Sequence, residues 1–173
     1  MKIIALAVGI VCAGLVSVSA AEVHAKISDV HLCCQGCVKG VQKAVATVEG
    51  VKAEVAQDDG TVTLVAADAA TLQKAADALV AAGYFGTCNE SGVRLNAASG
   101  AKGEKVQSLK IEGLHLCCGK CVKAVDRAVK SVAGAKEHTA VKGAKSFEVT
   151  GDFNDQDLLT ALQKEGLTGK VAK

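Results

Sequence analysis

The sequence predicts an α+β protein made of two similar halves, each with the element order βαββαβ, behind an N-terminal export signal. Three observations lead to this prediction. The motif His-Leu-Cys-Cys-x-x-Cys begins at His31 and again at His115, 84 residues later. Valines at helical spacing follow each copy. A similar succession of apolar segments and glycine turns then follows in both halves, so the repeat indicates a duplicated domain.

The first 21 residues have the pattern of a secretory signal. Lys2 is the only charged residue, an apolar run covers Ile3–Val16, and the small residues Ser19–Ala21 suit a cleavage site. The run is too short for a comfortable transmembrane helix. We therefore expect removal of residues 1–21, a mature chain starting near Glu22, and an exported protein, periplasmic or secreted, with no remaining membrane segment.

Residues 22–95, the first half, are expected to form one domain. Strands are predicted at Val23–Leu32, Val51–Ala56, Thr61–Val65 and Tyr84–Cys88, and helices at Cys37–Val48 and from Asp68 to Ala82. Asp59-Gly60 is a typical hairpin turn, and Asp68 suits a helix N-cap. The first helix is amphipathic because its valines recur with a 3-4-3 spacing, at Val38, Val41, Val45 and Val48.

Residues 105–173, the second half, repeat this order. Strands are predicted at Val106–Leu116, Ala135–Val141 and Ser146–Thr150 with a short one at the end, and helices at Cys121–Val132 and from Asn154 to Glu165. Residues 96–104 lie between the halves and are rich in Ala, Ser and Gly. We expect a flexible linker there, semi-independent halves and two sites that act separately.

The repeated motif predicts metal binding. Three thiols within five residues of one loop can converge on a soft metal ion. The third cysteine of each motif, Cys37 or Cys121, lies in the first turn of a predicted helix, where the helix dipole favours thiolate over thiol. The candidate ligands are His31, Cys33, Cys34 and Cys37 in the first loop, and His115, Cys117, Cys118 and Cys121 in the second.

Other roles for these residues stay open at this point. The paired cysteines could form disulfides in an oxidising compartment, although seven mature cysteines do not pair off evenly. Cys33 and Cys117 could instead be small buried residues, and His31 and His115 could be hydrogen-bond donors beside the ligands. Cys88 has no counterpart in the second half and is expected to be a structural or free thiol.

Two βαβ halves of this order make a ferredoxin-like sandwich, and each copy resembles the heavy-metal-associated domain of copper chaperones and of the periplasmic mercury-binding protein. The resemblance implies Cu(I) binding by Cys34 with Cys37 and by Cys118 with Cys121, with Hg(II) possible. Gly83-Tyr84 resembles the family's glycine-aromatic pair, whereas the second half has Gly166-Leu167. The extra cysteine and the histidine depart from the family pattern, and a Cys₃His set would suit Zn(II).

The sequence therefore predicts an exported protein that traffics or buffers a soft metal ion, most consistently Cu(I), with a metal-transporting or metal-accepting protein as partner. A net charge of +2 gives no indication of nucleic-acid binding. No catalytic triad, carboxylate pair or phosphate-binding loop is evident, so we do not expect an enzyme. Two alternatives remain: a thiol-disulfide redox protein, and a zinc-binding structural or adaptor module.

Overall fold

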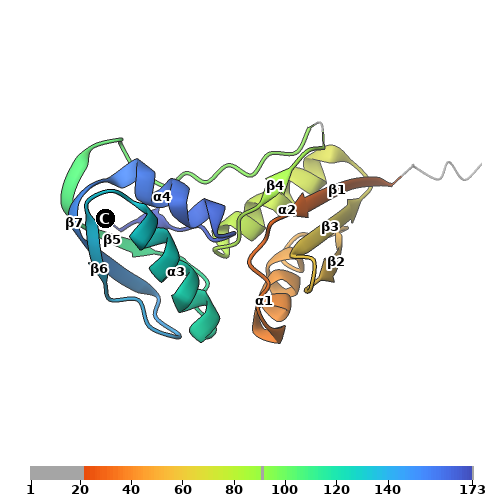
Figure 1. The fold of residues 1–173 in the computed structure, drawn as a ribbon. Helices are drawn as coiled ribbons and strands as arrows, with labels where there is room; N and C mark the ends of the chain where they lie inside the picture. Colours follow the sequence, from red (N-terminus) through yellow and green to blue (C-terminus); the bar gives the residue numbers. More distant parts are fainter. Residues whose placement is uncertain (1–21, 91, 173) are drawn as a thin grey trace, which may run out of the picture.

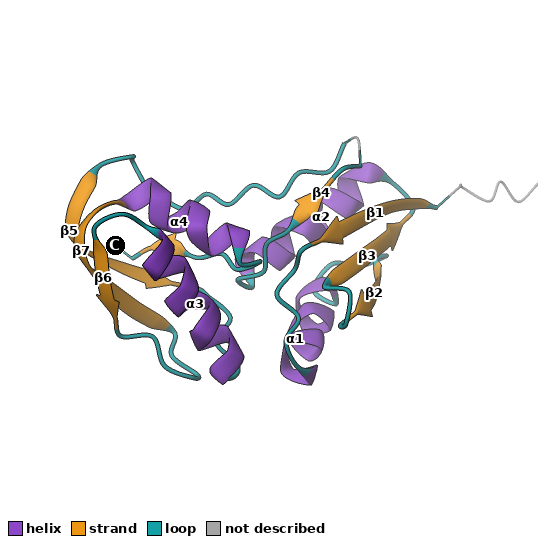
Figure 2. Ribbon diagram, in the orientation of Figure 1, coloured by secondary structure: helices purple, strands orange, loops and turns teal. Residues whose placement is uncertain are grey.

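The computed structural model describes residues 22–90 and 92–172. Within this range the chain forms two α+β halves, each a four-stranded antiparallel sheet with two helices, four helices in all (Figures 1 and 2). This architecture is consistent with two ferredoxin-like domains. The predicted export signal lies outside the described residues. Among the residues described, no helix has both the length and the apolar character needed to span a membrane.

The first half follows the predicted order. Its elements are β1 (Val23–Ser28), α1 (Gln35–Val45), β2 (Lys52–Ala56), β3 (Thr61–Ala66), α2 (Ala69–Ala81) and β4 (Thr87–Cys88). The strand order is β2-β3-β1-β4. Asp68 caps α2 as expected, because its carboxylate accepts a hydrogen bond from the Thr71 N–H at 2.8 Å.

The second half has the same topology. Its elements are β5 (Lys105–Glu112), α3 (Gly119–Ser131), β6 (Ala135–His138), β7 (Ser146–Asn154), α4 (Asp155–Lys164) and β8 (Lys170–Val171). The strand order β6-β7-β5-β8 matches that of the first half. The Asn154 side chain caps α4 by accepting from the Gln156 and Asp157 N–H groups.

The strands that lead into the cysteine loops end earlier than the sequence suggests. We expected them to reach Leu32 and Leu116, but β1 ends at Ser28 and β5 at Glu112. The next residue takes a left-handed backbone conformation in both halves, with φ of 61° at Asp29 and 84° at Gly113. A residue in this conformation cannot continue a strand. The segment between the first strand and the first helix is therefore longer in each half than the sequence suggested.

The linker segment is not a free coil. The Asp155 carboxylate, buried at the start of α4, accepts hydrogen bonds from the backbone N–H groups of Lys102, Gly103 and Glu104 at 2.8 to 2.9 Å. The Val171 N–H donates to the Ser99 carbonyl at 2.7 Å. Residues 99–104 therefore pack against the second half, which differs from the flexible linker that composition suggested.

The two halves are joined by their last loops, residues 83–85 and 166–168. The Phe85 N–H donates to the Gly166 carbonyl at 3.2 Å, and the Thr168 N–H donates to the Gly83 carbonyl at 3.1 Å. Tyr84 and Leu167 form an isolated antiparallel bridge between these bonds, and both are buried. The apolar core runs through both halves as one cluster. The structure thus gives the halves direct contacts, whereas the sequence suggested semi-independent halves, which stays a prediction.

Candidate metal centre

Each cysteine loop ends in the first turn of a helix, and these two helices flank the junction between the halves (Figure 1). Cys34 and Cys118 are the N-cap residues of α1 and α3, and both have extended backbone. Their carbonyls accept from the N–H groups of Cys37 at 2.9 Å and Cys121 at 3.2 Å. Neither N-cap side chain makes a capping bond, so both sulfurs are available to a ligand.

The six cysteines of the two loops meet at one place, which we call the cysteine cluster: Cys33, Cys34, Cys37, Cys117, Cys118 and Cys121. The shortest contacts run between the loops. Cys33 Sγ lies 3.3 Å from Cys118 Sγ, and Cys34 Sγ lies 3.5 Å from Cys117 Sγ. The two buried thiols also contact the opposite loop. Cys121 Sγ lies 3.6 Å from Cys33 Sγ, and Cys37 Sγ lies 3.5 Å from Cys117 Sγ.

Contacts within each loop follow the same pattern in both copies. The first and third thiols are 3.6 Å apart for Cys33 and Cys37, and 3.7 Å apart for Cys117 and Cys121. The second and third thiols are 4.0 and 3.9 Å apart. The cluster therefore has approximate twofold symmetry. The sequence predicted two separate sites; the structure brings all six thiols into one, because the paired loops at Gly83 and Gly166 hold the halves face to face.

The spacing of the sulfurs suits a metal better than a disulfide. A disulfide needs a sulfur–sulfur distance of about 2.05 Å, whereas the contacts between sulfurs in the cluster run from 3.3 to 4.0 Å. The seven cysteines in the described range are all free thiols. A metal–sulfur bond of about 2.3 Å places neighbouring sulfurs about 3.8 Å apart in a tetrahedral site and about 4.0 Å apart in a trigonal one.

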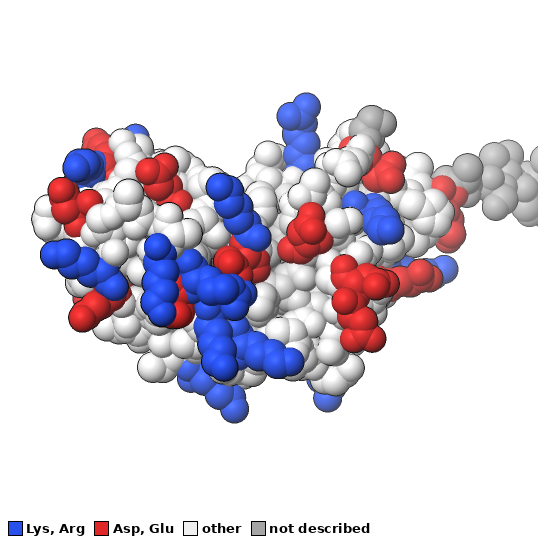
Figure 3. All heavy atoms as spheres, viewed as in Figure 1, with Lys and Arg blue, Asp and Glu red and all other residues white. Residues whose placement is uncertain are grey.

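The cluster has a buried side and an open side. Cys37 and Cys121 are fully buried, whereas the other four cysteines are partly exposed. A pocket of about 410 Å³ opens onto Cys33, Cys34 and Cys118, with Lys120 and Lys123 at its edge. The Lys120 ammonium also donates to the Cys33 carbonyl at 3.4 Å. Basic side chains gather over the α3 side of the molecule toward the junction (Figure 3), where they offset the charge of thiolates.

The cysteine pKa values differ with position. The backbone N–H of Cys37 lowers the pKa of the Cys34 thiol to about 7. Burial raises the pKa of Cys33 and raises that of Cys117 to about 12. The neighbouring Cys37 thiol lowers the pKa of Cys121, and Cys121 in turn raises the pKa of Cys37. The cluster therefore holds both thiols and thiolates, and a metal ion must displace the remaining protons when it binds.

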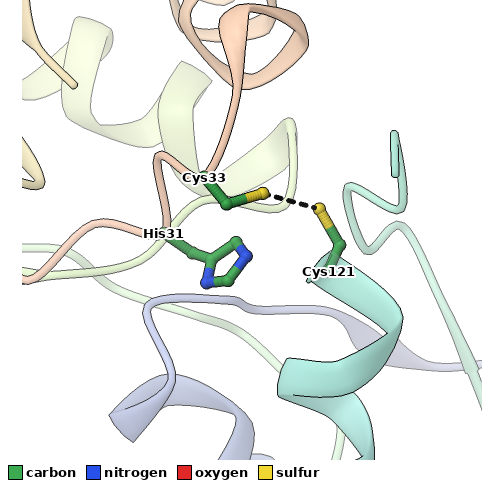
Figure 4. A group of neighbouring side chains, drawn as sticks. All are labelled: His31, Cys33 and Cys121. Carbon is green, nitrogen blue, oxygen red and sulfur yellow. Dashed lines mark hydrogen bonds between the residues drawn. The ribbon is translucent and has the colours of Figure 1, made fainter. Parts of the chain in front are cut away.

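The two histidines are not equivalent. His31 lies beside Cys33 and Cys121, and one ring nitrogen is within 4.8 Å of both sulfurs (Figure 4). The His115 ring packs on Tyr84 instead, with 4.8 Å between ring centroids, and burial lowers its pKa. The Nε2 atoms of both histidines are buried and lack a hydrogen-bond partner among the described residues. His31 can therefore supply a nitrogen ligand, whereas His115 packs against Tyr84.

Tyr84 supports the buried side of the cluster. Its hydroxyl donates to the Cys37 carbonyl at 3.0 Å. Gly40 on α1 makes room for this ring, since a Cβ at Gly40 would lie 2.1 Å from the Tyr84 Oη. The residues that match Gly40 and Tyr84 in the second half are Ala124 and the smaller Leu167. This mid-helix glycine was the signal in the sequence that could have identified Tyr84 as part of the site.

Cys88 lies outside the cluster. It sits in β4, paired with Ile27 of β1, and it belongs to none of the groups of side chains in the described residues that could hold a metal. Its expected role as a structural or free thiol stays a prediction, and the residue offers a control cysteine for experiments.

Comparisons with known proteins give little more. No protein-family model matches the sequence, and neither does any curated protein. Two similar solved structures are the N-terminal domain of PacS from Synechocystis PCC6803 and the N-terminal soluble domains of Bacillus subtilis CopA. The first is 21% identical and covers 39% of this chain and 100% of that chain, with a TM-score of 0.35. The second is 14% identical and covers 88% and 95%, with a TM-score of 0.34. The argument about function therefore rests on this chain's own residues.

Proposed function

We propose that this protein binds Cu(I) through the cysteine cluster and buffers or passes on the ion outside the cytoplasm. The observation that carries the proposal is the convergence of six thiols from two loops that are 84 residues apart in the sequence. Six thiols packed this closely would be an unfavourable concentration of partly charged groups without a cation. Thiolate sulfur is the ligand type that selects Cu(I) and other soft ions.

The grouping of the ligand atoms favours Cu(I) over Zn(II). In the described part of the chain, the sets of side chains whose ligand atoms all lie within 4.8 Å of one another have three members each. Zn(II) in a structural site takes four ligands in a tetrahedron, and Cu(I) accepts two or three thiolates. The zinc-module alternative would need a rearrangement of the loops.

The open side of the cluster gives a route for the ion. Cys33, Cys34 and Cys118 border the pocket, whereas Cys37 and Cys121 are fully buried. An incoming ligand can therefore replace the exposed thiolates first, and the metal leaves by ligand exchange with a metal-transporting or metal-accepting partner. Burial of the remaining thiolates slows release, which favours buffering over rapid transfer. Binding, and not catalysis, is the activity we propose.

Competition with a chromophoric Cu(I) chelator tests this function. The reduced protein should withdraw Cu(I) from the chelator, and the same protein alkylated at its thiols should not. Zn(II) at equal concentration should fail to displace the bound copper. Failure to compete for Cu(I), together with tight Zn(II) binding, would favour the structural zinc module. Loss of all six thiols to disulfides under mild oxidation, with no metal bound when reduced, would favour the redox protein.

A further inference from the structure

The sulfurs of the cysteine cluster fall into overlapping sets of three, which we call thiol triplets. The atoms of each triplet lie within 4.8 Å of one another. Any two of these triplets have a single sulfur in common, and the shared sulfurs are those of Cys34, Cys117 and Cys118. The three triplets are Cys33/Cys34/Cys118, Cys34/Cys37/Cys117 and Cys117/Cys118/Cys121.

The remaining sulfurs make a fourth, more open triplet, which is not among the sets whose atoms all lie within 4.8 Å of one another. Cys33, Cys37 and Cys121 each occur in only one of the first three. Cys33 Sγ lies 3.6 Å from both Cys37 Sγ and Cys121 Sγ. With this triplet included, there are four triplets, and each of the six sulfurs belongs to two of them. The triplets span both loops, so no half of the protein contains this arrangement alone.

We propose that the cysteine cluster binds four Cu(I) ions as one tetranuclear unit, with one ion in each thiol triplet and each thiolate bridging two ions. This inference rests on the proposed function and specifies its stoichiometry and architecture. Most edges of the triplets are sulfur–sulfur contacts of 3.3 to 4.0 Å, which need little expansion to reach the spacing of about 4.0 Å in a trigonal thiolate site. The sulfurs of Cys37 and Cys121 have no such contact and must draw together when an ion fills the fourth triplet. Four ions in six thiolates also give every ion three sulfur ligands without help from His31.

The step balances without an oxidant or reductant. Copper enters as Cu(I) and stays Cu(I), the six sulfurs lose to solvent the protons that they still carry, and twelve Cu–S bonds form. Six thiolates and four monovalent ions leave a net charge of −2 on the filled cluster. Lys120 and Lys123 border the open side, where their charges stabilise this excess.

Shared ligands make the filling cooperative. The first ion must displace the protons of the thiols that it binds and bring three sulfurs into one coordination plane. Each later ion finds bridging sulfurs that are already deprotonated and ordered. Intermediate species with one to three ions should therefore be scarce, and the empty and four-copper forms should dominate a titration.

Native mass spectrometry of the reduced protein during anaerobic Cu(I) titration tests this inference. We expect mainly empty and four-copper protein at half saturation, and X-ray absorption showing three sulfurs per copper with copper–copper scattering. Saturation at two ions without copper–copper scattering would overturn the tetranuclear cluster and leave Cu(I) binding intact. Absence of any Cu(I) binding would overturn both.

Two cysteine variants separate the cluster from general thiol chemistry. Cys117→Ser removes a sulfur that bridges two triplets and should abolish the four-copper form, whereas Cys88→Ser removes a thiol outside the cluster and should leave it unchanged. Circular dichroism should show that both variants fold. A four-copper form that persists in Cys117→Ser at wild-type affinity would overturn the proposal, as would its loss in folded Cys88→Ser.

Discussion

The two halves share a topology and a ligand motif, but they support the cysteine cluster differently. The first half places the large Tyr84 over Gly40, and the second half has Ala124 and the smaller Leu167 at the matching positions of the repeat. The first arrangement fills the space with an aromatic ring and gives the Cys37 carbonyl a hydroxyl donor. In the first half, the large ring on the loop is matched by a glycine on the helix, so that both fit into a close-packed interior.

A second difference concerns the histidines. Tyr84 reaches across the junction to pack on His115, which belongs to the second half. His31 has no such aromatic ring in the described contacts and lies beside Cys33 and Cys121 instead. Tyr84 of the first half thus gives His115 an aromatic ring to pack against, whereas His31 lies at the metal centre.

The largest effect should come from breaking the junction that both halves share. Gly83→Ala and Gly166→Ala each place a Cβ at a positive φ, 2.5 Å from the Gly113 carbonyl and 2.4 Å from the Asp29 carbonyl respectively. Backbone strain and the clash together should cost about 3 kcal/mol of unfolding free energy. Urea denaturation measures this cost, and native mass spectrometry should show loss of the four-copper form.

Gly113→Ala is the matched control for these substitutions. Gly113 also has a positive φ, 84°, but a Cβ there meets nothing within 4 Å. We expect Gly113→Ala to lower the unfolding free energy by only about 1 kcal/mol, from backbone strain, and to retain copper binding. Equal costs for all three variants would mean that the junction contributes nothing beyond glycine's backbone freedom.

The next effect sharpens the size comparison between the halves. Tyr84→Leu should destabilise the protein by about 2 kcal/mol because it leaves a cavity over Gly40. Gly40→Ala alone should also destabilise it, because the new Cβ overlaps the Tyr84 hydroxyl. The double variant reproduces the second half's arrangement and should regain at least 1 kcal/mol relative to the sum of the two singles. Additive costs in the double-mutant cycle would contradict this complementarity.

Sequence reasoning recovered the elements but not their assembly. The 3-4-3 valine spacing, Asp68 and Asn154 fixed the helices closely, because these signals are local. β1 ends early because Asp29 takes a left-handed backbone conformation, which residues other than glycine seldom adopt. The shared cluster depends on contacts between residues 83–85 and 166–168. Pairing of two distant loops leaves no pattern in a single sequence.

A smaller effect concerns the segment between the halves. Asp155 corresponds to Ala69 in the first half, which has no such anchor. Burial raises the pKa of Asp155, but hydrogen bonds from the backbone N–H groups of Lys102, Glu104 and Gly103 together lower it by more. The pKa of Asp155 therefore lies below its usual value. Asp155→Asn should cost about 1 to 2 kcal/mol at pH 7.

The loss of stability in Asp155→Asn should depend on pH, because it comes from the loss of this carboxylate. Because its pKa is lower in the folded than in the unfolded protein, its contribution is present above the unfolded value of about 3.9 and is lost as pH falls through the folded value. Denaturation of wild type and Asp155→Asn should therefore converge in stability at low pH. A difference that stays constant from pH 7 to pH 2 would assign the effect to something other than the carboxylate.

The smallest effect should come from exchanging the residues that directly follow β1 and β5. Asp29 holds a φ of 61°, where Gly113 holds 84° in the second half. Asp29→Gly should relieve strain and stabilise the protein by about 0.5 to 1 kcal/mol, whereas Gly113→Asp should destabilise it by a similar amount. Thermal unfolding should resolve both shifts. Destabilisation by Asp29→Gly would mean that the Asp29 side chain contributes more than the strain costs.

The most direct test of the account is the copper capacity of the Cys34→Ser/Cys37→Ser variant, measured by anaerobic Cu(I) titration beside wild type. These two residues contribute to three of the four thiol triplets, and the intact second loop retains Cys117, Cys118 and Cys121. One shared cluster predicts that the variant binds at most one ion, weakly and without cooperativity. Half of the wild-type copper, bound at wild-type affinity, would contradict the account and return the protein to two independent sites.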